Sequence, residues 1–327
     1  MIERRAFIAA LAVGGALASR PAHAQKAKGM PVIGWLSPAS ADDGLGNLQA
    51  LRAGLGELGY VEGENLVIEA RWAEGRSERL PRLAGELVRF PVRVLCSAGS
   101  QASAAAKQAT STIPIVFANV AFPDQSGLVT SYARPGGNIT GIAFIGPEYG
   151  KRLELLKEAN PRLSRVALVY NPENPGSVLA LQETQRWAST LGVRLEPHKF
   201  RGPQDFESVG GAIGERRPDA LMTTADPLIV SYRARFVDLA AKHRLLSMYP
   251  DREFVDIGGL MFYGGSITEM YRRAAVYVDK ILRGAKPGDL RVEQPTKFEM
   301  VINLKAMNAL GMTLPQSLLM RADEVIR

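Results

Sequence analysis

The side chains that most often perform catalysis or bind metal ions are scarce in this sequence. It has one cysteine, Cys96, and beyond the first 25 residues only two histidines, His198 and His243. Dispersed histidines beside a single cysteine are too few for a zinc site of the usual type. Neither the phosphate-binding pattern G-x-x-x-x-G-K-[ST] nor the nucleophile turn G-x-S-x-G occurs. We therefore expect a protein with no catalytic residue, no metal ion and no cofactor.

Small polar residues follow a predicted strand near the middle of the first half of the chain. Ser97, Gly99, Ser100 and Gln101 join a strand that ends at Cys96 to an alanine-rich helix. Carboxyl ends of parallel strands are where open α/β sheets bind ligands. We expect Ser100 to cap this helix, and the free N–H groups of the first turn either bind an anionic group of a ligand or bind no ligand. Both interpretations stay open on the sequence.

Asn171 and Asp226 occupy the equivalent turns in the second half of the chain. Asp226 is the one carboxylate that we expect at a strand end facing the first half. It would meet a cationic or hydrogen-bond-donating group of a ligand, or it would cap the helix that follows. Together with an anion near Ser100, the first interpretation predicts a ligand that resembles an amino-acid zwitterion.

Aromatic residues also gather at predicted strand ends. They are Trp35, Phe122, Tyr170, Tyr249, Phe262 and Tyr263. Such rings can enclose a flat ligand, although each taken singly is more often part of a core. We expect Phe122 and Tyr263 to form an aromatic wall of the ligand site. Cys96 is interpreted as a small buried side chain, not as a nucleophile.

A glycine pattern at residues 54–59 matches the dinucleotide fingerprint G-x-G-x-x-G. That fingerprint binds a pyrophosphate only where the glycines lie between a strand and the helix after it. Here the glycines follow a helical segment, residues 46–58. We therefore predict that they end this helix.

These residues must be positioned by strands and helices that alternate along the chain. Strands are expected at 31–36, 65–71, 92–96, 113–118, 140–145, 166–170, 193–196, 220–223, 245–248 and 259–262. Helices are expected at 46–58, 77–89, 101–109, 151–159, 178–191, 206–216, 227–243 and 267–283. Residues 291–304 read as extended. This alternation is typical of parallel sheets joined by crossover helices.

The α/β pattern runs twice, which predicts two similar doubly wound parallel-sheet lobes joined by a hinge. We expect the N-terminal lobe at 30–144 plus about 264–288, and the C-terminal lobe at 145–263 plus about 289–327. Ligand pockets usually form between such lobes. The cleft between the lobes is therefore the expected site.

The N-terminal residues 1–24 have the three regions of a secretory signal peptide. Arg4 and Arg5 precede an uncharged apolar run, and Ala22 and Ala24 mark a cleavage site. The run is about half the length that a membrane span requires. Both the Sec and the twin-arginine route fit this leader. We expect a periplasmic protein, without a lipid anchor because Gln25 and not cysteine follows the cleavage site.

The chain after this leader is mildly basic and has no disulfide. The leader carries three arginines and one glutamate, so its removal lowers the formal charge from +7 to +5. Basic residues are interleaved with acidic ones rather than gathered in one patch, which argues against nucleic-acid binding. With a single cysteine, stability must come from the hydrophobic core.

Five segments in order resemble a known family. They are LGELGYVEGEN at 55–65, ATSTIPIVF at 109–117, RPGGNITG at 134–141, LELLK at 153–157 and VINLK at 301–305. Together they look like the ABC-transporter substrate-binding family related to the tryptophan- and tyrosine-binding lipoproteins. The resemblance covers nearly the whole chain after the leader.

The resemblance implies a type I periplasmic-binding-protein fold, closure of two lobes on one small molecule, and delivery to an ABC permease in the inner membrane. By position, the cleft loops of the family correspond to Ser37, Ser97, Gly99, Ser100, Gln101, Asn119, Phe122, Asp124, Asn171, Asp226 and Tyr263. Relatives typically carry Asp-Pro before Gly-Leu-Val, where this chain has Phe122, Pro123 and Asp124. The identity of the ligand does not transfer across this change.

Three classes of function share such a scaffold. A monomeric transport binding protein fits the leader and the resemblance. A sensor that presents its bound form to a membrane receptor has the same sequence features, and only its partners would separate the two. An exported enzyme is disfavoured because the sequence lacks an acid–base constellation.

Overall fold

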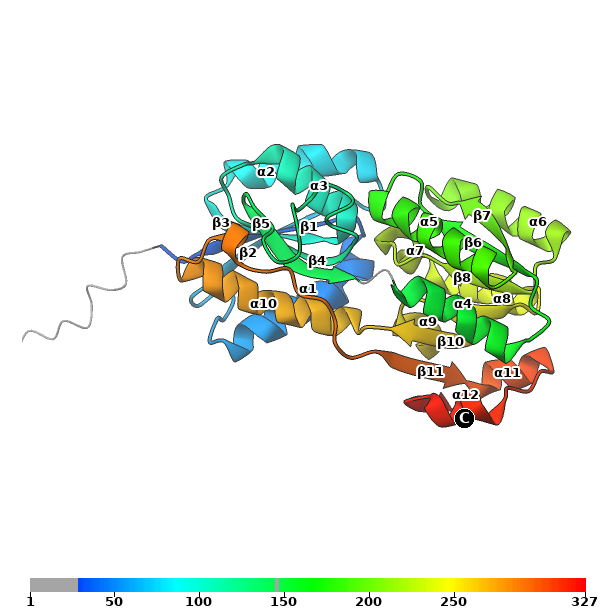
Figure 1. Cartoon of the computed structure of the whole chain (residues 1–327). Coiled ribbons are helices and arrows are strands. Elements are labelled where there is room, and N and C mark those ends of the chain that lie inside the picture. The colour runs from blue at the N-terminus through cyan, green and yellow to red at the C-terminus, as the bar shows by residue number, and fades with distance from the viewer. Residues whose placement is uncertain (1–28, 145–146) are drawn as a thin grey trace, which may run out of the picture. The chain divides into compact units, whose positions relative to one another are not determined.

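Two β-sheets organise the chain in the computed structural model, which describes residues 29–144 and 147–327 (Figure 1). Residues 31–327 form one compact unit that contains both sheets. The expected signal peptide, residues 1–24, lies outside the described residues. Within the described ranges, no helix has the length and apolar character that crossing a bilayer requires.

The first sheet has five parallel strands in the order β2-β1-β3-β4-β5. Its strands are β1 (Val32–Ser37), β2 (Val67–Trp72), β3 (Val92–Ala98), β4 (Ile115–Ala121) and β5 (Ile139–Phe144). Its helices are α1 (Ala41–Glu57), α2 (Leu80–Arg89), α3 (Gly99–Ala109) and, from late in the chain, α10 (Ile267–Leu282). Separate apolar clusters pack on the two faces of the sheet. Strands buried on both faces explain the continuous apolar runs in the sequence.

The second sheet has seven strands in the order β12-β11-β10-β9-β8-β6-β7. They are β6 (Arg165–Tyr170), β7 (Arg194–Lys199), β8 (Ala220–Thr223), β9 (Leu246–Tyr249), β10 (Met261–Gly264), β11 (Glu299–Asn303) and β12 (Glu324–Ile326). The helices are α4 (Pro147–Ala159), α5 (Pro175–Thr190), α6 (Phe206–Arg216), α7 (Pro227–Ser231), α8 (Arg233–Lys242), α9 (Arg252–Asp256), α11 (Leu304–Leu310) and α12 (Gln316–Arg321). Two parallel-sheet α/β lobes are thereby confirmed.

One strand pair departs from the predicted parallel pattern. β11 runs antiparallel to β10, with Met261 opposite Ile302. After β10 the chain forms α10, which packs on the first sheet, and then returns through an extended segment to β11. The connection from β10 to β11 therefore contains no helix that packs on the second sheet as a crossover. Antiparallel neighbours do not need such a crossover.

The chain passes between the sheets after β5, after β10 and before β11. The last passage begins late, because Glu293 still pairs with Ile142 beside β5 and the Val292 N–H donates to the Tyr132 carbonyl at 2.7 Å. Residues 290–293 therefore lie with the first sheet. The third passage falls between Glu293 and β11, later than the boundary near residue 289 that the sequence suggests.

Helix α10 lies against α1 and fixes the late segment on the first sheet (Figure 1). Contact is close at Gly54, where an added Cβ would lie 2.2 Å from the Arg272 carbonyl oxygen and 2.9 Å from the Ala275 side chain. The glycine pattern ends α1 as predicted: the helix stops at Glu57, and Gly59 has a φ of +86°. The dinucleotide interpretation is therefore excluded by position.

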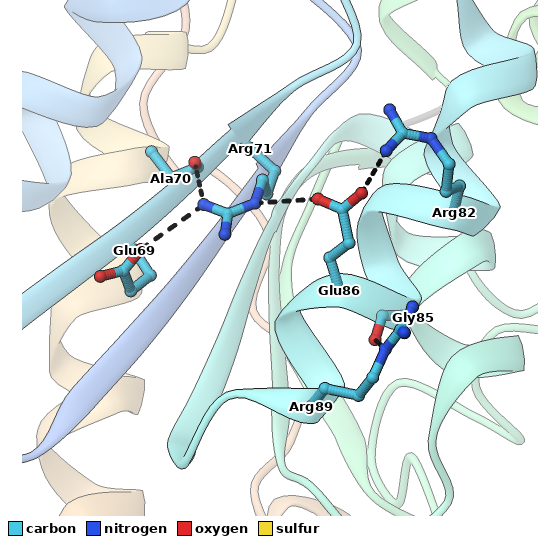
Figure 2. A network of polar contacts seen from close by, with 7 residues as sticks. All are labelled: Glu69, Ala70, Arg71, Arg82, Gly85, Glu86 and Arg89. Atoms are coloured by element: carbon cyan, nitrogen blue, oxygen red, sulfur yellow. Dashed lines mark hydrogen bonds and ion pairs between the residues drawn. The ribbon is translucent and has the colours of Figure 1, made fainter.

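A polar network fastens the edge strand β2 to α2 (Figure 2). Arg71 donates to the Ala70 carbonyl at 2.9 Å and to Glu86 at 3.2 Å, and it lies 3.5 Å from Glu69. Glu86 also pairs with Arg82 one turn earlier in α2. These side chains are partly exposed, so each pair contributes little to stability by itself.

Candidate ligand site

The carboxyl-end loops of the two sheets meet in residues 31–327. A Cβ added to Gly176, at the start of α5, would lie 2.5 Å from the Ser100 hydroxyl and 3.3 Å from Ala121. A Cβ on Gly99 would lie 3.1 Å from Pro227, the first residue of α7. We call this meeting of Gly99, Ser100 and Ala121 with Gly176 and Pro227 the interlobe seam. It is the position at which α/β sheets bind ligands.

Ser100 does not cap the helix that follows Cys96, contrary to the prediction from the sequence. Helix α3 begins at Gly99, and the residue before it, Ala98, has no side chain that can cap. Ser100 is therefore not the cap but the second residue of the helix, buried at the seam. The uncapped first turn keeps its N–H groups directed away from the helix.

The other residues of this loop have partners inside the first lobe. The Ser97 and Ser103 hydroxyls lie 2.9 Å apart, and Ser103 donates to the Gly99 carbonyl at 2.7 Å. The Gln101 amide nitrogen donates to the Ser77 hydroxyl at 2.9 Å, while its buried oxygen has no partner. Earlier in the chain, Ser37 accepts from the Ala39 N–H at 3.2 Å. Ser37, Ser97 and Gln101 thus hold loop geometry.

Strained backbone marks the end of β4. Asn119 and Phe122 have φ values of +57° and +49°, a region that side chains other than glycine rarely adopt. Asn119 lies where the β4–β5 register shifts between Ala118 and Val120. Its buried Oδ1 has no hydrogen-bond partner. Such strain is found most often at functional sites.

Phe122 packs on a ring that the sequence pattern does not single out. It stacks on Tyr149 of α4, with ring centroids 6.3 Å apart and planes 19° apart. Tyr263, the other expected wall residue, is partly exposed and stacks instead on Phe298, 6.0 Å away. Asp124, expected near the ligand, has an exposed side chain. Phe122 is thus at the seam with Tyr149 as its partner.

Asp226 is fully buried and its oxygens are occupied. It caps α7 by accepting from the Leu228 N–H at 2.9 Å and the Ile229 N–H at 3.2 Å. The Asn174 amide donates to its other oxygen at 2.7 Å. Burial raises the pKa of Asp226, and these hydrogen bonds lower it. These contacts match the capping interpretation.

Asn171 holds the neighbouring turn. Its N–H donates to the Ser177 hydroxyl at 2.9 Å, and its side-chain oxygen accepts from the Glu173 N–H at 3.0 Å. Ser177 and Thr224 lie 2.6 Å apart and join this turn to the one that precedes Asp226. The second-lobe side of the seam is therefore a connected polar layer.

A charged pair at the start of α4 is not apparent from the sequence. Arg152 is 0% and Glu148 2% exposed, and the Arg152 Nη2 donates to the Glu148 Oε2 at 2.8 Å. Arg152 Nε also donates to the Tyr263 carbonyl at 2.7 Å. Arg152 Nη1 and Glu148 Oε1 are buried without a partner. Desolvation raises the pKa of Glu148 to about 7, although the Arg152 charge lowers it.

Nothing in the sequence distinguishes this pair from a surface pair. A Glu and an Arg four residues apart on a helix are usually a solvated i,i+4 pair. The resembling segment LELLK begins at residue 153, directly after Arg152. The burial of Glu148 and Arg152 follows from the packing of α4 against the end of β10, at Tyr263 and Gly264.

The remaining aromatic candidates belong mainly to the core. Trp35 packs on Tyr271 with centroids 5.6 Å apart, and its buried Nε1 has no partner. Tyr170 and Phe262 are buried in clusters of the second lobe. Tyr249 is stacked on the α9 side of that lobe. Of the six rings, Phe122 alone has a partner ring on the opposite side of the seam among the described contacts.

Comparison with known proteins shows which family this chain belongs to. The family described as ABC transporter substrate binding protein matches residues 34–326. The chain belongs to this family. Family membership makes it a substrate-binding protein of an ABC transporter and not a member of an enzyme family. Such proteins normally act outside the cytoplasm, with a small molecule and a transporter as partners.

Three individual proteins illustrate the relationship. A tyrosine-binding protein of Clostridioides difficile (strain R20291) is 24% identical over 260 residues, covering 79% of this chain and 74% of the relative. A conserved domain protein from Vibrio cholerae is 27% identical with a TM-score of 0.86, covering 90% of this chain and 99% of that one. An ABC domain in complex with L-Trp from Streptococcus pneumonia is 24% identical with a TM-score of 0.83, covering 90% of this chain and 100% of that one.

The side chains that could bind a metal ion or react as a thiol are dispersed or buried. Among the described residues, no three His, Cys, Asp or Glu side chains are grouped so as to hold a metal ion. Cys96 is buried and free, and desolvation raises its pKa to about 12. The interpretation of Cys96 as a small core residue is confirmed.

Proposed function

We propose that this protein captures one small molecule at the interlobe seam and delivers it to the permease of an ABC importer, without transforming it. The supporting observation is a set of buried polar atoms that lack partners around strand ends and the neighbouring helices. Among the described residues they include Gln101 Oε1, Asn119 Oδ1, Glu148 Oε1, Arg152 Nη1, Asn171 Nδ2 and Thr223 Oγ1. Buried polar groups are nearly always hydrogen-bonded, so we propose that polar groups of the ligand complete the unpaired ones near the seam.

The proposed ligand is an aromatic amino acid or a close analogue. Relatives include a tyrosine-binding protein and a protein in complex with L-Trp. At the seam, Phe122 and Tyr149 supply apolar aromatic surface, and the unpartnered atoms supply polar contacts. We propose that this protein is a monomer and that residues 1–24 are removed when it is exported. In this proposal one lobe comprises residues 30–144 with about 264–293, the other comprises 145–263 with about 294–327, and the three passages join them.

Binding is tested by calorimetry and thermal unfolding of the exported chain with L-tryptophan and L-tyrosine, using glucose as an unrelated control. A ligand that binds only the folded state at 100 times its Kd adds about 2.7 kcal/mol to the free energy of unfolding. We expect a rise in Tm with an aromatic amino acid and none with glucose. A flat response to both amino acids would contradict the proposed ligand class.

Transport is tested separately in cells. Deletion of the gene should abolish uptake of the labelled ligand, and expression of the exported chain should restore it. Chemically unchanged ligand recovered from the complex supports the absence of catalysis. Conversion of the ligand by the purified protein would contradict it.

A further inference from the structure

We infer that Glu148 and Arg152 form the polar anchor of the ligand: Arg152 binds a carboxylate, and Glu148 accepts from an amino or hydroxyl group next to it. This inference rests on the proposed function and adds the two residues that recognise the carboxylate of the ligand and the group next to it. It moves the anchor from Ser100 and Asp226 to the first two turns of α4.

The location of the pair favours this role. Tyr149, between the two residues in sequence, stacks on Phe122 in the loop after β4. Ala225, in the loop after β8, packs against the apolar cluster that contains Tyr149 and Phe122. The start of α4 therefore lies between the strand-end loops of both sheets, where ligands of this fold class bind.

Arg152 is held rigidly with one end free. Its guanidinium lies over the rings of Phe144 and Tyr149, 5.3 and 5.2 Å from their centroids. Nε and Nη2 are engaged by the Tyr263 carbonyl and by Glu148, and Nη1 is not. A planar guanidinium with a preset orientation loses little freedom when it binds a carboxylate.

Glu148 offers the complementary half. Its Oε2 accepts from Arg152, and its buried Oε1 has no partner. An ionised carboxylate accepts hydrogen bonds and cannot donate them. The ligand group that bonds to Glu148 Oε1 must therefore be a donor. A buried pair that is half satisfied is costly, and a ligand with an acceptor and a donor on adjacent atoms satisfies both halves.

Asp226, in contrast, already has three donors, from Leu228, Ile229 and Asn174. An amino group of a ligand would have to displace or share these contacts. Arg152 is also the one buried arginine or lysine among the described residues, and its Nη1 has no partner. The carboxylate of an amino acid is therefore directed to Arg152.

The pair is tested by comparing ligands that differ only at the carboxylate. Calorimetry on the wild-type protein measures Kd for L-tryptophan, L-tryptophanamide and tryptamine. We expect the two analogues without a carboxylate to bind at least about tenfold more weakly, as a lost charge-assisted hydrogen bond implies. In Arg152→Met, the ratio of the tryptamine Kd to the tryptophan Kd should fall towards one, because methionine offers the carboxylate neither a charge nor a donor.

Controls separate recognition from stability. Lys151 and Glu154 form an exposed pair on the same helix, so K151M and E154Q should leave the ratio unchanged. An unchanged ratio in Arg152→Met overturns the assignment while the binding function stands. If that variant does not fold, equal wild-type affinity for tryptophan and its amide overturns the assignment by itself. A wild-type protein that binds neither L-tryptophan nor L-tyrosine overturns both the ligand class and this anchor.

Discussion

Single residues at the seam show how burial changes the meaning of a charged side chain. Asp226 and Glu148 are both buried carboxylates at the start of helices in the second lobe. Asp226 is surrounded by donors and stabilises a helix terminus. Glu148 has one oxygen without a donor. Residue type and position relative to a helix were visible in the sequence, whereas the number of donors around each oxygen was not.

Glu148 should make stability depend on pH. Its pKa is raised by burial from 4.5 to about 7, so between these values the folded chain binds a proton that the unfolded chain has released. The contribution of Glu148 to the free energy of unfolding should therefore be greatest below about pH 4.5 and fall by up to about 3 kcal/mol as pH rises to about 7. Urea unfolding across this range measures the slope.

Two variants assign that slope. Asp251, whose pKa is also raised by burial to about 7, contributes with the same sign. Glu148→Gln should therefore flatten the pH profile in part and not completely. Glu154→Gln, on an exposed position of the same helix, should leave it unchanged. Identical profiles for wild type and Glu148→Gln would show that Glu148 keeps an ordinary pKa.

Among the elements, the contact of α1 with α10 gives a sharp prediction at one glycine. Gly54→Ala would place a Cβ 2.2 Å from the Arg272 carbonyl oxygen, so the helices must move apart. We expect a loss of about 1–3 kcal/mol in the free energy of unfolding. Chemical unfolding of the purified variant measures it.

The control for this substitution lies in the same helix. A methyl group added at Gly46 would have no neighbouring atom within 4 Å, and alanine favours helix over glycine by about 1 kcal/mol. Gly46→Ala should therefore stabilise the protein. Equal effects of the two substitutions would mean that α1 and α10 are not in close contact.

Most elements were predictable because their apolar patterns are long. The strand expected at 92–96 is β3, and the helix expected at 206–216 is α6. The short elements α9, α11, α12 and β12 were not predicted. They are three to seven residues long, too short for a periodicity to emerge. The antiparallel direction of β11 depends on tertiary connection and not on local sequence.

The site was less predictable than the fold. The seam contains the expected Ser100 and Phe122, because strand ends can be located from the pattern of apolar runs. Tyr149 and Arg152 were missed because a helix start gives no sign of which face is enclosed. Tyr263 and Asp124 were selected by position along the chain and stay predictions as ligand contacts.

For the whole molecule, the seam contacts imply that the lobes must part to admit a ligand. Ser100 and Gly176 offer a way to trap the closed form. A Cβ on Gly176 would lie 3.3 Å from the Ser100 Cβ, near the separation that disulfides require. S100C together with G176C should form a disulfide, and L-tryptophan should speed its formation if the ligand favours closure.

Titration of free thiols during mild oxidation measures that rate, and S100C alone is the control. The oxidised double variant should neither bind nor release L-tryptophan at the wild-type rate, and reduction should restore both. A disulfide that forms equally fast with and without an aromatic amino acid that binds would show that closure and binding are independent.

The burial of Cys96 has a practical consequence. A thiol with a pKa of about 12 that is 2% exposed is almost entirely protonated at neutral pH, and maleimides react with thiolates. A fluorophore could therefore be attached to one cysteine introduced on an exposed loop, with the natural cysteine left in place. Placed on a segment that shifts as the lobes meet, the dye would report ligand concentration by its emission, which would make the protein a reagentless optical sensor.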